Sequence, residues 1–235
     1  MRTPMVERWG GWIVTGTFTG DHRGNGIAAR DDHDRWAVRG RRAGDLSAFA
    51  DQFDPAVYLA PTSDIGALLA FEQQATVHNL LIRAALQMRC LQESDHALNA
   101  MLGEDGEREQ TAKIADRLAK SIANCLLMAE EAPLAGHAAA AASAFALAYP
   151  QLWPAGPDGS RLGELDLRDR VFALPLSPAV HSAAFAALPD ALRVRVLERL
   201  RRALTGRLPA GVAMAKEQRA AIDAHLRATL PGYAE

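Results

Sequence analysis

Apolar residues recur at spacings of three and four along most of the chain after residue 63, which is the period of an α-helix. In the first such segment they are Ile65, Leu68, Leu69, Ala75, Ile82 and Leu86. Pro61 is followed by Thr62 and Ser63, two residues that favour the N-cap position. The pattern predicts a long helix from about Ser63 to Cys90 or beyond.

A second helix is predicted after Gly106. Its apolar positions keep the same spacing up to Pro133 and comprise Ile114, Leu118, Ile122, Cys125 and Ala129. Only a short polar loop, Glu104-Asp105-Gly106, separates the two helices, so they should form an antiparallel hairpin. Further helices are predicted at Ala138–Tyr149, Ser177–Ala187, Pro189–Gly206 and Lys216–Leu230, with a linker rich in proline and glycine at Pro150–Gly163.

The first 45 residues follow a different pattern. Trp12–Phe18 is rich in β-branched and aromatic residues, Asn25-Gly26 favours a two-residue turn, and Ile27–Ala29 begins a returning strand. The charged segment Asp31–Gly44 is typical of a loop. The predicted fold is mainly α: a multi-helix, bundle-like domain at residues 46–235 carries a small N-terminal β-hairpin segment at residues 1–45. A further boundary can be placed at the 150–163 linker.

Composition is that of an ordinary globular chain. Its 235 residues are 49% hydrophobic and 23% charged, which excludes a disordered or collagen-like protein. The longest run without charge, Ala132–Pro157, is broken by prolines and rich in alanine, so we expect no transmembrane segment. The N-terminus lacks the apolar stretch of a signal peptide, which predicts a cytoplasmic chain if its start is genuine, or a fragment.

Charge gives little indication of a partner. The net charge of −2 exerts no general attraction on nucleic acid or anionic membrane. The segment Arg193–Arg207 carries six arginines, and its Arg195, Arg199 and Arg202 are predicted to form a basic surface that points away from the core. No helix-turn-helix signature accompanies them, and the chain has 23 arginines against 3 lysines throughout, so we expect no nucleic-acid binding.

A polar stripe on the first long helix is the most distinctive pattern. Glu72, Asn79 and Arg83 lie along one face and are flanked by leucines, which predicts a buried polar network. Such a cluster either sets the packing register or holds a general acid or base in a pocket, and we favour the structural role. Gln74 and His78 lie on the other side, where a solvated or hydrogen-bonded pair is the simplest interpretation.

Metal and cysteine chemistry find little support in the sequence. In each of the pairs Glu72–His78 and Glu131–His137 the two residues are six positions apart, which turns the second side chain of a helix away from the first. A third candidate, Asp21-His22, lies in a charged loop. We therefore expect no metal site.

Cys90 and Cys125 belong to no Cys-x-x-Cys motif, and the predicted hairpin separates them by about 20 Å, which predicts two free buried thiols.

Several segments together resemble one family, the uncharacterised bacterial periplasmic cytochrome-c-like proteins, in the region downstream of their haem attachment motif. The similar segments are 7–17, 22–25, 63–69, 77–84, 131–134, 165–172 and 230–233, and they include Glu7-Arg8-Trp9-Gly10-Gly11-Trp12, Val77-His78-Asn79-Leu80-Leu81-Ile82-Arg83-Ala84 and Leu230-Pro231-Gly232-Tyr233. The resemblance covers nearly the whole chain, although none of these motifs is diagnostic alone. It implies a periplasmic location and a redox protein or haem domain as partner.

Two departures from the family pattern concern histidines. Phe18 and Gln73 stand where the family has histidine, and the Cys-x-x-Cys-His segment that attaches haem c is missing. The chain is therefore either a fragment or a member without haem, and the altered histidines favour the second interpretation.

Our leading hypothesis from the sequence is a non-catalytic helical scaffold or docking module for redox machinery. The alternative is a haem-dependent electron-transfer protein, with His22 or His78 as ligand to a haem c attached through a missing upstream segment. Neither a P-loop, a dinucleotide fingerprint nor a Gly-x-Ser-x-Gly motif is found, and we predict no catalytic residue and no cofactor bound by this chain alone.

Overall fold

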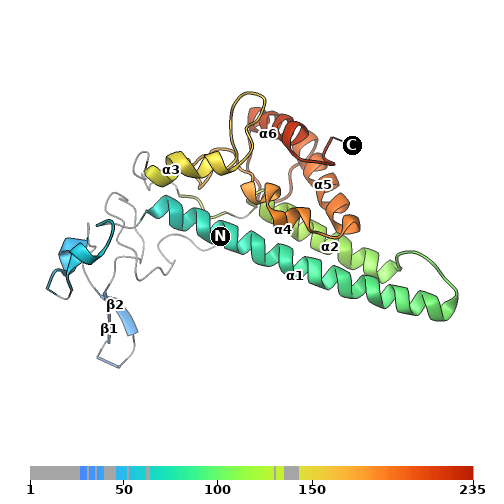
Figure 1. Ribbon diagram of the computed structural model, residues 1–235, viewed down its shortest axis with the longest axis horizontal. Helices are drawn as coiled ribbons and strands as arrows, with labels where there is room; N and C mark the ends of the chain where they lie inside the picture. Colours follow the sequence, from blue (N-terminus) through green and yellow to red (C-terminus); the bar gives the residue numbers. More distant parts are fainter. Residues whose placement is uncertain are drawn as a thin grey trace. The chain divides into compact units, whose positions relative to one another are not determined.

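The computed structural model describes residues 27–30, 32–34, 36–39, 46–51, 53–61, 64–129, 131–134 and 143–234. These residues are mainly helical, which confirms the predicted fold class (Figure 1). They divide into two compact units, each discontinuous in sequence. The first comprises described residues of Met1–Phe71, Glu131–Tyr149 and Leu165–Val171, and the second those of Glu72–Glu130, Pro150–Glu164 and Phe172–Glu235.

The first unit contains short elements. Strand β1 (Ile27–Arg30) pairs antiparallel with β2 (Trp36–Arg39), and the short helices are η2 (Leu46–Phe49), η3 (Pro55–Val57) and α3 (Ala144–Ala148). The strand predicted at residues 12–18 lies outside the described residues. Its pairing with residues 27–29, and the boundary at residue 45, therefore stay predictions.

A helix and a loop approach each other closely in the first unit. Helix α1 (Ile65–Leu102) starts in this unit, and at Gly66 a Cβ atom would lie 2.8 Å from Leu165 Cδ1 and 3.1 Å from Leu167 Cδ1. The backbone N–H of Val171 donates to Glu131 Oε1 at 3.0 Å. A larger residue at position 66 would require the ends of these leucine side chains to shift, which shows how closely the Leu165–Val171 segment packs on α1.

The second unit is built on the predicted hairpin. The remainder of α1 and α2 (Glu109–Leu126) run antiparallel, as expected, and the turn between them passes through Gly103 and Gly106, both with positive φ. Helix α5 (Asp190–Thr205) packs on α2, and α6 (Lys216–Thr229) packs on α5 (Figure 1). The limits of α5 and α6 agree closely with the sequence prediction.

One contiguous hydrophobic core holds the second unit together. Its fully buried members include Leu81, Met88, Ile122, Leu126, Leu162, Leu176, Leu192, Val196, Leu200, Ile222, Leu226 and Tyr233. The segment Pro150–Gly163, which has the composition of a linker, thus contributes Leu162 to this core. Its proline and glycine content marks an irregular backbone, but this backbone is packed.

Two serine caps shape the segment before α5. Ser177 Oγ accepts from Ala179 N and begins η5 (Pro178–His181), and Ser182 Oγ accepts from Phe185 N and begins α4 (Ala183–Ala186). The predicted cap at Ser177 is confirmed, but the second cap divides the expected helix into two short ones.

Among the described residues, we find no helix with the length and apolar character needed to cross a membrane.

Candidate functional site

The second unit contains a pocket of about 460 Å³ formed by three segments that lie far apart in the sequence. Its lining residues are Leu152, Trp153, Pro154, Val180, His181, Ser182, Phe185, Ala186, Arg193, Thr229, Leu230 and Pro231. Leu152 ends η4 (Tyr149–Leu152), and Thr229 ends α6. Most of the walls are apolar, and the polar groups are few, which is the usual composition of a small-molecule site.

His181 is the first polar group of the pocket. Its Nε2 lies 3.5 Å from Thr229 Oγ1, a distance at the limit of a hydrogen bond. The hydroxyl of Thr229 already donates its only proton to the backbone oxygen of His225 at 2.7 Å. Thr229 can therefore only accept from His181, which favours the tautomer that carries its proton on Nε2.

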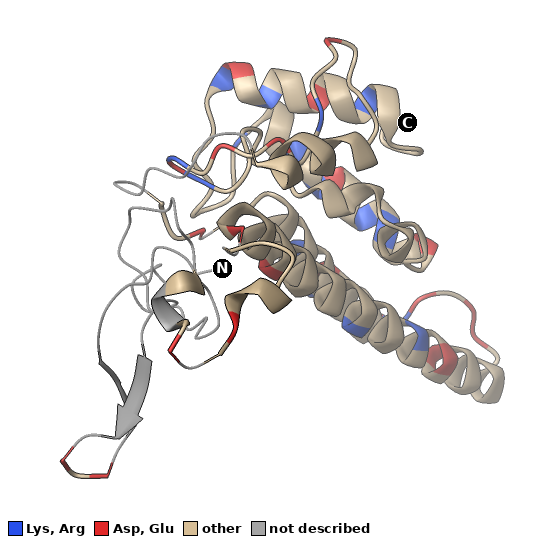
Figure 2. Cartoon of the chain, turned by 60° about the vertical axis from the view of Figure 1, so that its left-hand side comes forward, with Lys and Arg blue, Asp and Glu red and all other residues tan. Residues whose placement is uncertain are grey.

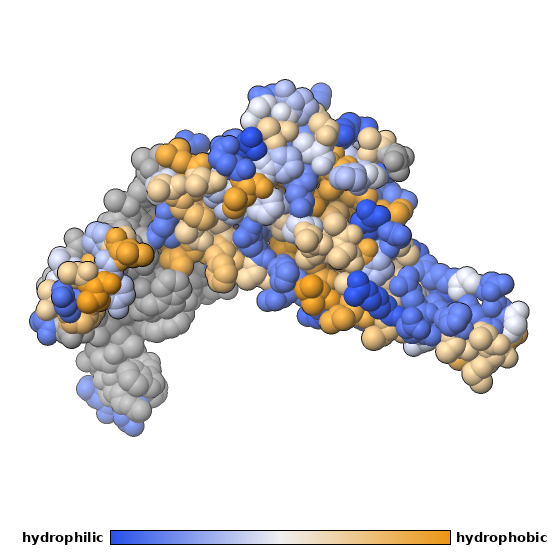
Figure 3. All heavy atoms as spheres, viewed as in Figure 1, coloured by the Kyte–Doolittle hydropathy of each residue, from blue (hydrophilic) through white to orange (hydrophobic). Residues whose placement is uncertain are grey.

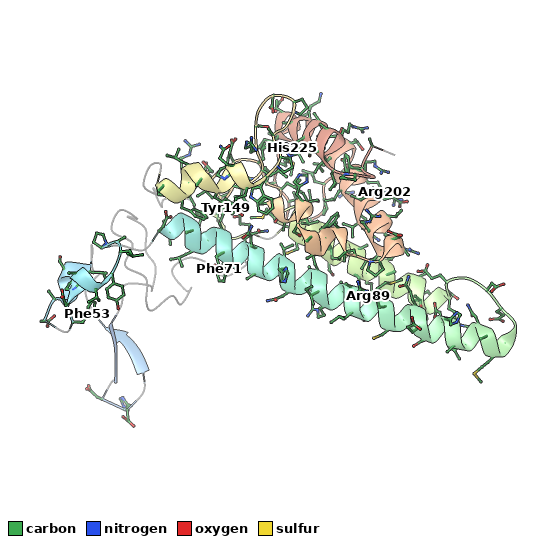
Figure 4. The ribbon with its side chains drawn as sticks, in the orientation of Figure 1. Phe53, Phe71, Arg89, Tyr149, Arg202 and His225 are labelled. Atoms are coloured by element: carbon green, nitrogen blue, oxygen red, sulfur yellow. The ribbon has the colours of Figure 1, made fainter. Side chains whose placement is uncertain are left out.

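His225 lies behind His181 and is fully buried. The two rings are 5.6 Å apart between centroids and inclined at 59°. Neither ring nitrogen of His225 has a hydrogen-bond partner among the described residues. Figure 4 shows His225 on α6 within the second unit. A buried polar group without a partner is costly and uncommon in native proteins.

Burial controls the electrostatics of this histidine pair. Burial, together with a smaller effect of the neighbouring His225, lowers the pKa of His181 to about 4. Burial also lowers the pKa of His225, although the charge of Asp158 acts in the opposite direction. Both rings are therefore neutral at neutral pH, and His181 offers one N–H donor and one lone pair.

A tight loop packs directly against His225. A Cβ atom at Gly156 would lie only 2.7 Å from His225 Nδ1, so only glycine fits there without a shift. Gly156 N donates to Ser160 O at 2.7 Å, and Ser160 donates to Asp158 Oδ1 from both its backbone nitrogen, at 3.0 Å, and its hydroxyl, at 2.6 Å. The hydrogen bonds from the hydroxyl and the backbone nitrogen of Ser160 lower the pKa of Asp158, and all three bonds fix the loop.

The same loop is tied to the pocket wall. The guanidinium of Arg161 donates to the backbone oxygen of Trp153, and Arg161 also forms a β-bridge with Ala155. The loop therefore positions Trp153 at the pocket and Gly156 at the His225 ring.

Arg193 is the only charged residue among the described residues that line the pocket. Its Nη2 donates to Asp190 Oδ1 at 2.7 Å. Its Nε is buried and has no acceptor within the described part of the chain. Because the side chain of Asp190 is 87% exposed, this ion pair lies at the surface.

The polar stripe predicted to be buried is exposed. Glu72, Asn79 and Arg83 all lie on the solvent side of α1, so the expectation of a buried network is wrong. The buried polar residue of this region is the neighbouring Gln73, whose Oε1 accepts from the buried Ser177 Oγ at 3.0 Å. Gln73 is also the position at which the resembled family has a histidine.

The arginines of α5 do not form one free basic surface. Arg195 donates to Glu107 and lies 3.5 Å from Asp116 Oδ1, and Arg199 lies 3.7 Å from the same oxygen. Both contact acidic residues around α2, contrary to the expectation that they point away. Arg202 is exposed and pairs with Glu198 of its own helix at 3.1 Å. Figure 2 shows acidic and basic residues interspersed on the helices.

The histidine ligand candidates are not brought together. His22 lies outside the described residues, and His78 is exposed on α1. No group of three or more metal-ligating side chains occurs in the parts of the chain that the structure describes. Both cysteines are free, and Cys125 is partly buried, but Cys90 is exposed, so its predicted burial is wrong.

Sequence reasoning missed both His181 and His225. A signal for His225 exists, because it shares the buried stripe of α6 with Ile222 and Leu226. His181 ends a single 3₁₀ turn, where no periodicity marks a buried face.

Comparisons with protein-family models, curated proteins and solved structures found no match to this chain. The resemblance to cytochrome-c-like proteins therefore stays a prediction.

Proposed function

We propose that this chain is a non-catalytic helical binding module whose second unit takes a small, largely apolar molecule into the His181 pocket. The observation that carries this proposal is the combination in one pocket of aromatic and aliphatic walls with a few polar groups, among them His181, Arg193 and Thr229. The pocket volume, about 460 Å³, is within the range of sites for small organic molecules.

A binding role agrees with the state of the hydroxyl groups in the pocket. Ser182 Oγ caps α4 by accepting from Phe185 N, and Thr229 Oγ1 donates to a backbone oxygen. A nucleophilic hydroxyl needs a base that accepts its proton. The Thr229 hydroxyl directs its proton to the backbone oxygen of His225, and not to His181 at 3.5 Å. Docking to a redox partner, as the family resemblance implies, is compatible with this role and forms the wider part of the proposal.

The experiment measures saturable binding of an uncharged fluorescent probe, N-phenyl-1-naphthylamine, to the purified chain. Ala186 is exposed and lines the pocket, so Ala186→Trp should obstruct it without touching the core. Ala183 is exposed on the same helix outside the pocket, and Ala183→Trp is the matched control.

We expect saturable binding that Ala186→Trp weakens about tenfold or more and Ala183→Trp leaves unchanged, since tenfold corresponds to the loss of about 1.4 kcal/mol of contact. Absence of saturable binding, or equal effects of the two variants, would overturn the proposal.

A further inference from the structure

We infer that the natural ligand of the His181 pocket is a monocarboxylate, an apolar body that carries one carboxylate group. This inference rests on the proposed function and names the ligand's chemical class. The charge of the residues that line the pocket is the first observation in favour of a carboxylate. Arg193 is cationic, and the described residues that line the pocket include no aspartate or glutamate. A ligand with a negative charge is therefore favoured over a neutral or cationic one.

The hydrogen-bond donors of the Arg193 guanidinium are the second observation in favour of a carboxylate. The Nε and Nη2 groups of a guanidinium point in parallel and can bind both oxygens of one carboxylate. In Arg193 the Nη2 donates to Asp190 Oδ1, whereas Nε has no acceptor among the described residues. One half of this two-pronged donor is thus unused. A ligand carboxylate can take both donors, because the exposed Asp190 pair contributes little and is easily exchanged.

His181 supplies another hydrogen-bond donor to the same pocket. Its Nε2 has Thr229 Oγ1 as neighbour at 3.5 Å, too far for a strong bond, and Thr229 can only accept. The N–H of His181 is therefore available to an oxygen of the ligand. The two N–H groups of Arg193, the N–H of His181 and a single positive charge suit a monocarboxylate, whereas a phosphate dianion would call for more cationic groups.

The remaining walls define the body of the ligand. Trp153, Val180, Phe185 and Leu230 are apolar or aromatic and line the pocket together. Such walls accept an aromatic ring or a medium-length hydrocarbon chain, and the indole N–H of Trp153 is the one polar group among these four side chains. Aryl-alkanoic acids and medium-chain fatty acids are the simplest molecules of this description.

The test compares two probes with the same body, 4-phenylbutyrate and 4-phenyl-1-butanol, in displacing N-phenyl-1-naphthylamine from the full chain. We expect the carboxylate to displace the reporter at a concentration about tenfold lower than the alcohol, as charge-assisted hydrogen bonds are worth roughly that factor. Arg193→Gln should abolish the difference, because it weakens binding of the carboxylate far more than binding of the alcohol. Arg193→Lys, which retains the charge without the paired donors, should give an intermediate preference.

Arg219 provides a matched control. Its Nε is also buried and has no partner within the described residues, and its Nη1 donates to Gly206 O, but it does not line the pocket. Arg219→Gln should therefore preserve the preference for the carboxylate. If the Arg193→Gln chain does not fold, as judged by circular dichroism, Arg193→Lys alone decides the outcome.

The outcomes separate this inference from the proposed function. Equal displacement by the acid and the alcohol, or a preference of wild type for 4-phenylbutylamine, would overturn the carboxylate inference and leave the binding module standing. A preference for the carboxylate that survives in both Arg193 variants would also overturn it. Failure of the reporter itself to bind would instead overturn the proposed function.

Discussion

Two polar clusters of the second unit each contain buried groups, but the hydrogen-bonding groups of one have partners and several in the other have none. At the turn end of the α1–α2 hairpin, the nearly buried Asp95 accepts from Arg108 N at 3.0 Å and from Thr111 Oγ1 at 2.9 Å. Asn99 accepts from the Arg108 guanidinium and donates to Gly106 O. Every one of these groups has a partner, and hydrophilic residues cover much of this end of the hairpin (Figure 3).

The cluster around the pocket is deeper and less satisfied. Both nitrogens of His225 and the Nε of Arg193 have no partner in the described part of the chain. Folding gains nothing from unpaired buried polar groups, and each one lowers stability. The hairpin cluster therefore serves the fold, whereas the unused Nε of Arg193, a residue that lines the pocket, is better explained by a ligand.

The largest effect is expected at the satisfied cluster. Asp95→Ala removes the acceptor of two buried or partly buried donors, and we expect a loss of about 3 kcal/mol in the free energy of unfolding. Urea denaturation followed by circular dichroism measures it. Asp95→Asn retains one acceptor oxygen and should cost less. A loss below about 1 kcal/mol for Asp95→Ala would show that the cluster does not stabilise the hairpin.

Acid should weaken the protein through the unsatisfied cluster. The pKa of His181 is about 4 in the folded chain, whereas an exposed histidine of the unfolded chain has the ordinary pKa of 6.5. The unfolded state therefore binds more protons between these pH values. The contribution of His181 to stability is fully present above pH 6.5 and falls as pH decreases toward 4. We expect a loss of about 2 kcal/mol between about pH 7 and pH 4.5 from this residue.

The acid effect has its own control. His181→Gln removes the titrating ring. Between about pH 7 and pH 4.5, the free energy of unfolding of this variant should therefore fall by about 2 kcal/mol less than that of wild type. Parallel pH profiles for the two chains would place the acid sensitivity elsewhere.

A smaller effect is expected when His225 is made apolar. His225→Leu replaces two unpaired nitrogens by a side chain of similar volume, and the free energy of unfolding should change by no more than about 1 kcal/mol, because the relieved desolvation cost offsets the altered packing. Thermal unfolding at neutral pH checks this. A loss as large as that of Asp95→Ala would mean that His225 is as well satisfied as the hairpin cluster.

The smallest effect should come from the exposed stripe of α1. Asn79 and Arg83 lie on its solvent side, so replacing either by Ala should change the unfolding free energy by no more than about 0.5 kcal/mol. If these residues belonged to the buried network predicted from the sequence, each substitution would instead lower the free energy of unfolding by about 3 kcal/mol. Urea denaturation of the two variants distinguishes these values.

The helices were predictable because their signals are local. Helices α2, α5 and α6 show a clear apolar stripe, and Ser177-Pro178 is a recognisable start. The buried face of α1 was not predictable, because apolar residues occur on several of its sides, and Ile82 and Leu86 remain exposed. Periodicity identifies a buried face only where the opposite face is polar.

The pocket was beyond sequence reasoning for a different reason. Its walls come from irregular segments around Trp153 and His181 and from the end of α6, and only tertiary packing brings these together. The proline and glycine content of Pro150–Gly163 indicates turns, but it does not indicate that Gly156 packs on a histidine far along the chain.

The assembly of the pocket from distant segments has a kinetic consequence. Contacts of the hairpin turn join residues close in sequence, such as Asp95 and Thr111, so they can form early in folding. The pocket needs the chain from Leu152 to Pro231 to be in place, which requires closure of much longer loops. A ligand that binds only the finished pocket would leave the folding rate nearly unchanged and slow unfolding, so that it prolongs the lifetime of the native state.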